Sequence, residues 1–462
     1  MKVLTSRNEC LTLADAAMSS GGEGELHAVL FKPASFASKD ICVKIYFKSK
    51  RSKQLEQKLL FMAANPPQNK ESEGSLLAWP LEVVYNTQKM FLGFVMPLAF
   101  ANSEPLIYLT EKKISKKLDP IWSQKFDRSL GAYSMIARLK LICNIAISVH
   151  KLHVTNRYVL RDFKPENVLV TPEGKVTLVD MDSIQITDTN GTEKPMFHDF
   201  SATPNYMPPE HYTNGVGKNP NVAVRKSWDY FSLGVVFYQI VFGLHPYVVN
   251  PLHVSDDNSN DIYRNVAQNL FPFGPNHEKI SSYPPLHDNF KYIPLQLQDL
   301  FKSAFSSDPN ARPSLEIWVK SIKEIIRTTP TPQPPSYGIL LMTTSHDFAV
   351  EVWVDDQHRG RITRSMSPLN IKVSEGKHKV YVNAGAKQCS CEVWVNYGET
   401  KSLNVWGIYE ENKSHNVSPP QPVIYPSKNV NNTSSDKSGC IWGITIVLIL
   451  GTAFMTGIIL GA

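Results

Sequence analysis

The sequence predicts an α+β fold of more than one unit, and three observations lead to this prediction. Strand-like runs near the start are followed by long helical periodicity, which indicates a mixed unit over residues 15–328. Alternation of apolar and polar residues over 338–408, punctuated by glycines, indicates a small antiparallel β domain. The final residues, 441–462, carry no charge and are long enough for one transmembrane helix.

Two segments without apolar periodicity separate these units. Residues 329–337 contain four prolines, which cannot continue a helix and favour an extended linker. Residues 409–440 are rich in Asn, Ser, Pro and Lys, which predicts a disordered tether. For 441–462 the alternative is a buried core helix, but such helices seldom run so long without a polar face.

Composition argues against two classes of protein. A formal net charge of +6 over 462 residues is mild, and the basic residues are spread along the chain, so nucleic-acid binding is not expected. Six cysteines, most of them far apart, do not form a disulfide framework, which favours a reducing compartment. The first twenty residues hold charges and no long apolar run, so no secretory signal is expected.

A glycine-rich stretch stands near the start of the chain. It fits the pattern G-x-G-x-x-G-x-V, with serine at the first glycine position and leucine in place of valine. Glycines let backbone amides approach a phosphate without an intervening Cβ, although a glycine-rich hairpin turn has the same pattern. The candidate phosphate-binding residues are Ser19, Gly21, Gly22, Gly24 and Leu26.

An apolar strand-like run at 41–45 contains one lysine, Lys44. A buried lysine needs an anionic partner. Glu56, in the helical stretch 54–63, is the candidate partner. A surface lysine and a solvated glutamate are the alternatives.

The segment 160–167 reads L-R-D-F-K-P-E-N and displays a carboxylate and an amide, Asp162 and Asn167, from one short loop. Phosphoryl transfer needs a carboxylate near the acceptor hydroxyl and a second group that holds metal. The segment resembles the H-R-D-L-K-P-E-N motif of protein kinases at six of eight positions. On this motif the chain is identified as similar to the eukaryotic-like serine/threonine protein kinase superfamily.

Further motifs follow in the order that this family has. Asp180-Met181-Asp182 stands where kinases carry D-F-G, and residues 202–210 resemble the G-T-P-x-Y-M-A-P-E end of an activation segment. Residues 228–234 and 308–313 resemble D-x-x-S-L-G and D-P-x-x-R-P. The resemblance implies an ion pair between Glu210 and Arg312. The GGEG loop and the D-x-D-S segment are similar to a divergent bacterial subfamily.

The resemblance implies a two-lobed protein kinase fold and an ATP-dependent serine/threonine kinase that acts on protein substrates with ATP and Mg²⁺. In such a site Asp162 is the catalytic base, and Lys164 contacts the transferred phosphate. Asn167 and Asp180 are the implied magnesium ligands. Three residues depart from the family pattern. Leu160 and Met181 replace His and Phe of the motifs, and as apolar residues they could pack in the core. The acidic Asp182 replaces Gly.

The resemblance also implies the nucleotide-binding residues. Lys44, oriented by Glu56, holds the α and β phosphates. Backbone groups near Met96 and Leu98 contact adenine, although the segment around them also fits an ordinary core strand.

The β domain loosely resembles the PEGA type of small bacterial domain, with a carbohydrate or protein partner or a spacer role as the alternatives. One span at the end of the chain, Lys437 just before it, and a need for cytosolic ATP predict a single-pass membrane protein whose kinase and β domains face the cytoplasm. The rival hypothesis is a catalytically silent ATP-binding scaffold, motivated by the altered Asp180–Asp182 segment. The sequence does not predict the oligomeric state.

Overall fold

The computed structural model describes eleven stretches of the chain. The predicted tether (409–440), membrane segment (441–462) and most of the linker (331–336) lie outside them. The chain divides into one unit of Met1–Leu118 with Ser134–Pro330 and a second of Asp119–Tyr133 with Thr331–Ala462. The described stretches are 1–67, 71–72, 74–115, 117–188, 194–197, 202–252, 261–330, 337–345, 347–385, 388–396 and 398–404.

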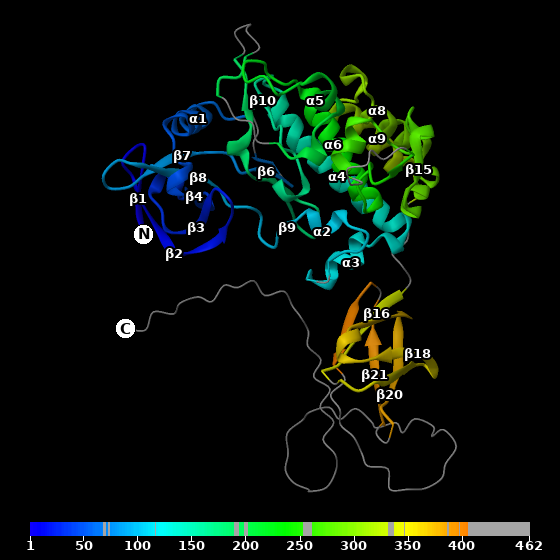
Figure 1. Ribbon diagram of the computed structural model, residues 1–462. Coiled ribbons are helices and arrows are strands. Elements are labelled where there is room, and N and C mark those ends of the chain that lie inside the picture. The colour runs from blue at the N-terminus through cyan, green and yellow to red at the C-terminus, as the bar shows by residue number, and fades with distance from the viewer. Residues whose placement is uncertain are drawn as a thin grey trace, which may run out of the picture. The chain divides into compact units, whose positions relative to one another are not determined.

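The first lobe of the larger unit is a closed barrel in the order β1-β2-β3-β4-β8-β7, and every neighbouring pair is antiparallel (Figure 1). Its interior holds buried Val3, Leu11, Val43 and Val95. The expected start of the domain at residue 15 is too late, because β1 and the first half of β2 belong to this barrel. The strands are β1 (Lys2–Thr5), β2 (Cys10–Ser20), β3 (Gly24–Phe31), β4 (Ile41–Tyr46), β7 (Glu82–Tyr85) and β8 (Phe91–Pro97).

Helix α1 (Lys53–Ala64) packs beside β7 (Figure 1). Its start is capped by Ser52, whose hydroxyl accepts a hydrogen bond from the Leu55 amide at 3.1 Å. At its other end the indole of Trp79 donates to the carbonyl of Met62 at 2.8 Å. Both ends of the helix are therefore fixed.

A second sheet, in the order β5-β6-β12-β11-β9, joins strands that lie far apart in sequence. Its β11–β12 hairpin is antiparallel, whereas β6 runs parallel to β12. The candidate catalytic segments flank this hairpin. The remaining strands of the unit are β5 (Glu71–Ser72), β6 (Ser75–Leu77), β9 (Glu104–Pro105), β10 (Tyr158–Val159), β11 (Val168–Val170), β12 (Val176–Leu178), β13 (Gln185–Ile186), β14 (Asn250–Pro251) and β15 (Ile280–Ser282).

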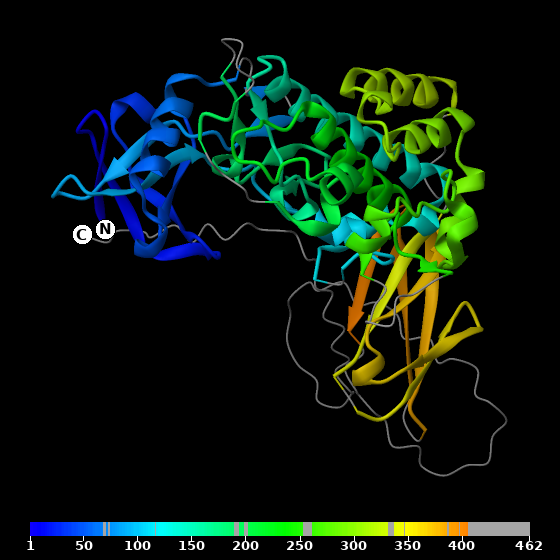
Figure 2. The ribbon, with the colours of Figure 1, turned by 45° about the horizontal axis from the view of Figure 1, so that its top comes forward.

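The second lobe is mainly helical, and the turned view in Figure 2 shows it as a group of green helices apart from the blue barrel. Helix α6 is buried almost throughout and packs against α2 and α8. Among the described residues α4 is the one helix long and apolar enough to cross a membrane, but 56% of its apolar window is buried, as in a core helix. The helices are α2 (Ile107–Thr110), α4 (Ala132–His153), α5 (Pro209–Asn214), α6 (Lys226–Phe242), α7 (Ile262–Ala267), α8 (Leu295–Ala304) and α9 (Leu315–Thr328).

The smaller unit contains two sheets, β19-β16-β22 and β18-β17-β20-β21, whose inner side chains form one apolar core. Val350, Val352 and Val354 point into this core, as their alternation predicts. The expectation of a purely antiparallel domain is wrong, because β16 and β22 pair in parallel. The strands are β16 (Tyr337–Thr343), β17 (Val350–Val354), β18 (Gln357–Ile362), β19 (Leu369–Ser374), β20 (Gly376–Asn383), β21 (Gln388–Val395) and β22 (Thr400–Asn404).

A short segment from the middle of the chain also belongs to the smaller unit. Helix α3 (Pro120–Phe126) contacts β22, and the Gln124 amide donates to the Thr400 hydroxyl at 2.9 Å. The predicted unit over 15–328 is therefore interrupted by residues 119–133.

Candidate active site

The loop that carries Asp162 is fixed by a buried carboxylate in the first turn of α6. Asp229 accepts hydrogen bonds from the backbone amides of Leu160 at 2.7 Å and Arg161 at 2.9 Å. His153 contacts the same carboxylate at 2.8 Å. These bonds hold Arg161 in a left-handed conformation, with φ of 60°, and so set the direction in which the loop continues.

Asp162 faces the side chains of Lys164 and Thr203. Its Oδ2 lies 2.8 Å from the ammonium of Lys164, and its Oδ1 accepts a hydrogen bond from the Thr203 hydroxyl at 2.6 Å. Lys164 also donates to Thr203 at 3.0 Å. The side-chain amide of Asn167 donates to the Asp162 carbonyl at 2.9 Å. This bond uses the amide nitrogen of Asn167, whereas a metal ion would be bound by its amide oxygen.

The β11–β12 hairpin brings Asn167 and Asp180 together. Val168 pairs with Leu178, and the Val179 amide donates to the Asn167 carbonyl at 3.0 Å. Since Asn167 precedes one strand and Asp180 follows the other, both lie at the open end of the hairpin. A carboxylate and an amide oxygen are ligand types that divalent cations such as Mg²⁺ accept.

Lys44 projects from β4 toward three carboxylates. Its ammonium lies 2.6 Å from Asp182, 3.2 Å from Asp180 and 3.4 Å from Glu23 of the glycine-rich loop. The Tyr46 hydroxyl donates to the same Asp182 oxygen that Lys44 contacts. The three carboxylates lie within reach of one another, which makes this the most strongly charged cluster of the candidate site.

The electrostatics of this cluster follow from burial and charge. Burial acts to lower the pKa of Lys44, but the charges of Asp182, Asp180 and Glu23 outweigh it and raise the pKa. Burial acts to raise the pKa of Asp182, and the contact with Lys44 outweighs it, so this pKa is lowered. Burial and the neighbouring charge of Asp182 raise the pKa of Asp180. The cluster therefore keeps a cationic lysine and an anionic Asp182.

The expected pair between Lys44 and Glu56 is wrong in this structure. Glu56 instead contacts Lys53, one helical turn earlier, at 2.9 Å, and accepts a hydrogen bond from the Tyr85 hydroxyl at 3.0 Å. The sequence placed Glu56 on the correct helix, but neither its spacing nor its charge could show that β7 offers a competing partner.

The glycine-rich stretch forms the hairpin between β2 and β3. The Gly21 amide donates to the Gly24 carbonyl at 2.9 Å and closes the turn. A Cβ at Gly24 would lie 2.2 Å from the carbonyl oxygen of Ile45, whereas one at Gly22 would meet nothing within 4 Å. Only Gly24 is therefore required by close packing. The residues expected to cover the phosphates are all in this hairpin: Ser19, Gly21, Gly22, Gly24 and Leu26.

The segment expected to contact adenine lies at the end of β8. Met96 pairs with Cys42 of β4, and the Leu98 amide donates to the Asp40 carbonyl at 2.9 Å. The chain then runs to β9, which pairs with β11 of the second sheet. The segment thus connects the barrel to the sheet that carries Asn167, although the Leu98 amide itself is already hydrogen-bonded.

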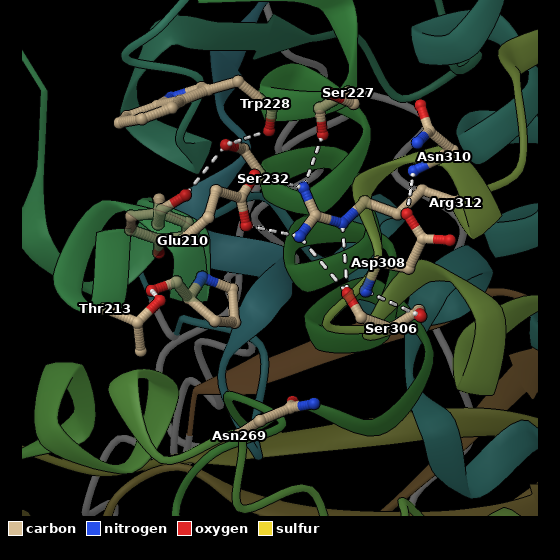
Figure 3. A network of polar contacts seen from close by, with 12 residues as sticks. Glu210, Thr213, Ser227, Trp228, Ser232, Asn269, Ser306, Asp308, Asn310 and Arg312 are labelled. Carbon is tan, nitrogen blue, oxygen red and sulfur yellow. Dashed lines mark hydrogen bonds and ion pairs between the residues drawn. The ribbon is translucent and has the colours of Figure 1, made fainter. Parts of the chain in front are cut away.

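The expected pair between Glu210 and Arg312 is confirmed, and Figure 3 shows the guanidinium directed at the carboxylate. Two parallel bonds join them at 2.6 and 2.8 Å. Arg312 also donates to the carbonyls of Ser227 and Ser306. The pair joins α5, which follows the activation segment, to the turn before α9.

Two departures from the motifs are buried, as expected for core residues. Leu160 and Met181 are 5% and 3% exposed. Sequence reasoning did not assign roles to Asp229, His153, Tyr46 or Glu23. For Asp229 the available signal was a single acid inside the long apolar run of α6.

With this geometry in place, the comparisons with known proteins define the class of domain. Residues 102–325 match the family model "Protein kinase domain". Residues 102–325 therefore resemble a protein kinase domain and have the mixed helix and strand content of its α+β fold, and domains of this class use ATP and a divalent metal ion. The barrel that contains Lys44 precedes the matched residues.

Curated relatives are protein kinases of modest identity. The chain is 28% identical to "Protein kinase 3" of Dictyostelium discoideum over 49% of this chain and 22% of that protein. It is 26% identical to "Protein kinase YegI" of Escherichia coli K12, over 70% of this chain and 46% of that protein. It is 30% identical to "Serine/threonine-protein kinase YPK2/YKR2" of Saccharomyces cerevisiae, over 39% of this chain and 24% of that protein. The chain spans less than half the length of each of these relatives.

Proposed function

We propose that this chain is a serine/threonine protein kinase that transfers the γ-phosphate of ATP to hydroxyl groups of protein substrates. One observation carries the proposal: the Lys44 ammonium lies 3.2 Å from Asp180, at the hairpin end that also presents Asn167 and the Asp162 loop. Lys44 of the barrel and the two segments that flank the β11–β12 hairpin thus supply a cation, two metal-type ligands and a carboxylate to one place, which is the set that phosphoryl transfer needs.

Each side chain has a role that its contacts support. Lys44 binds the α and β phosphates, and Asp180 with Asn167 holds Mg²⁺, which would neutralise charge on the phosphates. Asp162 orients the acceptor hydroxyl and receives its proton. Lys164, 2.8 Å from Asp162, then lies where it can contact the transferred phosphate.

The preference for serine and threonine is supported by the contacts of Thr203. This side chain bonds to both Asp162 and Lys164, and a Thr and a Lys at these motif positions are typical of serine/threonine rather than tyrosine kinases. Two of the relatives described above carry no residue specificity in their names, and one is named a serine/threonine kinase.

Transfer of labelled phosphate from Mg-ATP to a panel of serine-, threonine- and tyrosine-containing peptides tests this function. Asp162→Asn keeps the size of the side chain and removes its capacity to accept a proton. General base catalysis contributes about 10²–10⁴-fold, so transfer should fall by that order while Mg-ATP still binds. Transfer undiminished by Asp162→Asn would reject the assignment of the base.

We also propose a tether to the cytoplasmic face of a membrane through 441–462, supported by the uncharged length of that segment. Deletion of 441–462 should move the chain from the membrane fraction to the soluble fraction and leave peptide phosphorylation unchanged. An unaltered distribution would reject the tether. The PEGA-like β domain then serves as a spacer or a recruiting surface.

The second candidate is a catalytically silent scaffold that binds ATP. The specific observation behind it concerns Asp182, which stands at the position of the motif glycine. Asp182, Asp180 and Glu23 all form ion pairs with the Lys44 ammonium, which a phosphate would otherwise contact. Binding of Mg-ATP without transfer to any peptide, including the chain itself, would favour the scaffold.

A further inference from the structure

The shortest ionic contact of Lys44 is with Asp182 and not with a residue of α1. The Asp182 side chain is 3% exposed, and its Oδ2 lies 2.6 Å from the Lys44 ammonium. Tyr46 donates its hydroxyl to the same oxygen. Lys44 and Tyr46 are two residues apart on β4, so both project from the same face of the strand toward this one carboxylate.

A tight turn places Asp182 at this position. Asp180 adopts a left-handed conformation, with φ of 59° and ψ of 37°, and begins the 3-10 helix Met181–Ser183. The Ser183 hydroxyl donates to the Asp180 carbonyl at 2.7 Å and closes the turn. The same three-residue turn therefore sets the positions of both carboxylates.

The burial of Asp182 is costly unless the charge is compensated. A carboxylate removed from water loses much of its hydration free energy, and a cation partner offsets this loss. Within the described part of the chain its second oxygen, Oδ1, is buried without a hydrogen-bond partner. A buried oxygen without a partner is uncommon in native proteins and calls for a physical explanation, of which a functional role is one.

We propose that Asp182, held by Tyr46, is the residue that positions Lys44 for the nucleotide phosphates, in the place of an acidic residue on α1. The inference rests on the proposed function and deepens it. Because Asp182 and Asp180 share one turn, the position of the lysine is coupled to that of the metal-holding carboxylate. Glu56 is engaged by Lys53 and Tyr85 and does not take part in this coupling.

The test compares matched acid-to-amide variants of the full chain. Asp182→Asn and Glu56→Gln each remove one carboxylate charge at nearly constant volume, and Tyr46→Phe removes one hydroxyl. For each variant the Kd for Mg-ATP, kcat and the KM for ATP are measured, with urea unfolding to verify the fold. Lys44→Met and the double variant Lys44→Met/Asp182→Asn complete a cycle.

Asp182→Asn should lower kcat/KM for ATP about 10- to 100-fold, the range for loss of a hydrogen bond between charged groups. Tyr46→Phe should produce a smaller loss in the same direction, and Glu56→Gln a loss several-fold smaller than Asp182→Asn. In the Lys44→Met background, Asp182→Asn should cause no further loss, because Asp182 acts through Lys44. A purely structural role would instead give independent, additive losses.

Equal losses for Asp182→Asn and Glu56→Gln, or additive losses in the double variant, would overturn the inference. If the native chain binds Mg-ATP but transfers no phosphate, the kinase proposal fails. The positioning role of Asp182 is then tested separately by comparing the Kd for Mg-ATP of the same variants. If the native chain binds no Mg-ATP, both proposals are rejected.

Discussion

Replacement of Glu210 by glutamine should destabilise the larger unit strongly, because it leaves the buried guanidinium of Arg312 without a compensating charge. The Arg312 side chain is 0% exposed and that of Glu210 is 8% exposed, and two bonds of 2.6 and 2.8 Å join them. Glu210→Gln retains a hydrogen-bonding side chain of the same shape but removes the compensating charge. The remaining partners of Arg312 are neutral carbonyls, which do not neutralise it.

The magnitude follows from the burial of both partners. Removal of one member of a buried ion pair costs about 3–5 kcal/mol. With a urea slope of about 3 kcal/mol/M, at the upper end for small proteins, the unfolding midpoint should fall by about 1 M or more. Such a loss is a large share of the about 5–15 kcal/mol that stabilises an ordinary domain.

Urea unfolding of the full chain, followed by tryptophan fluorescence, measures this shift. The matched control is Glu324→Gln, because Glu324 and Arg327 also lie 2.6 Å apart but their side chains are 47% and 73% exposed. Its midpoint should stay where it is, since water already solvates both charges. A shift for Glu210→Gln no larger than that for Glu324→Gln would refute the reasoning.

Two further predictions concern the glycine-rich hairpin and the buried histidines. Gly24→Ala should destabilise the barrel and weaken Mg-ATP binding, since its Cβ would lie 2.2 Å from a carbonyl oxygen of β4, while Gly22→Ala should retain the melting temperature; calorimetry checks both. Burial lowers the pKa of His245 to about 3 and that of His287 to about 4, so the unfolded chain binds protons that the folded chain does not. Urea midpoints should therefore fall as the pH drops from about 6.5 toward 4. His245→Gln should make the midpoint less dependent on pH, whereas the control His277→Gln, at an exposed position, should leave the dependence unchanged.

The fold could be predicted where local pattern decides it. The alternation of valines with Glu351 and Trp353 over residues 350–354 correctly indicated which face of this strand is buried, because side chains along a strand alternate with a period of two. The parallel pairing of β16 with β22 could not be predicted, since the two strands are separated by most of the β domain. The grouping of residues 119–133 with that domain depends on contacts across more than 200 residues, such as Gln124 with Thr400, which periodicity does not reveal.

The candidate site divides in the same way. Asp162 and Asn167 stand five residues apart on one loop, and a short hairpin separates Asn167 from Asp180, so their proximity is almost a consequence of chain connectivity. The Glu210–Arg312 pair spans 102 residues and was expected only from the family resemblance. The support of the catalytic loop by Asp229 was missed, because its partners there are backbone amides, which every residue but proline carries and which a sequence pattern therefore cannot identify.

The partner of Lys44 shows why an ion pair is harder to predict than a motif. Helical spacing placed Glu56 on α1, but a carboxylate goes where its total interaction free energy is lowest, and Lys53 with Tyr85 already supplies a cation and a donor. Movement of Glu56 to Lys44 would sacrifice both contacts and displace Asp182, which has no other cation within the described site. Asp182, by contrast, is two residues from Asp180 and cannot move without altering that turn. The geometry of the lysine is thus governed by the turn after β12, and a signal that displaced α1 alone would leave the Lys44–Asp182 pair in place.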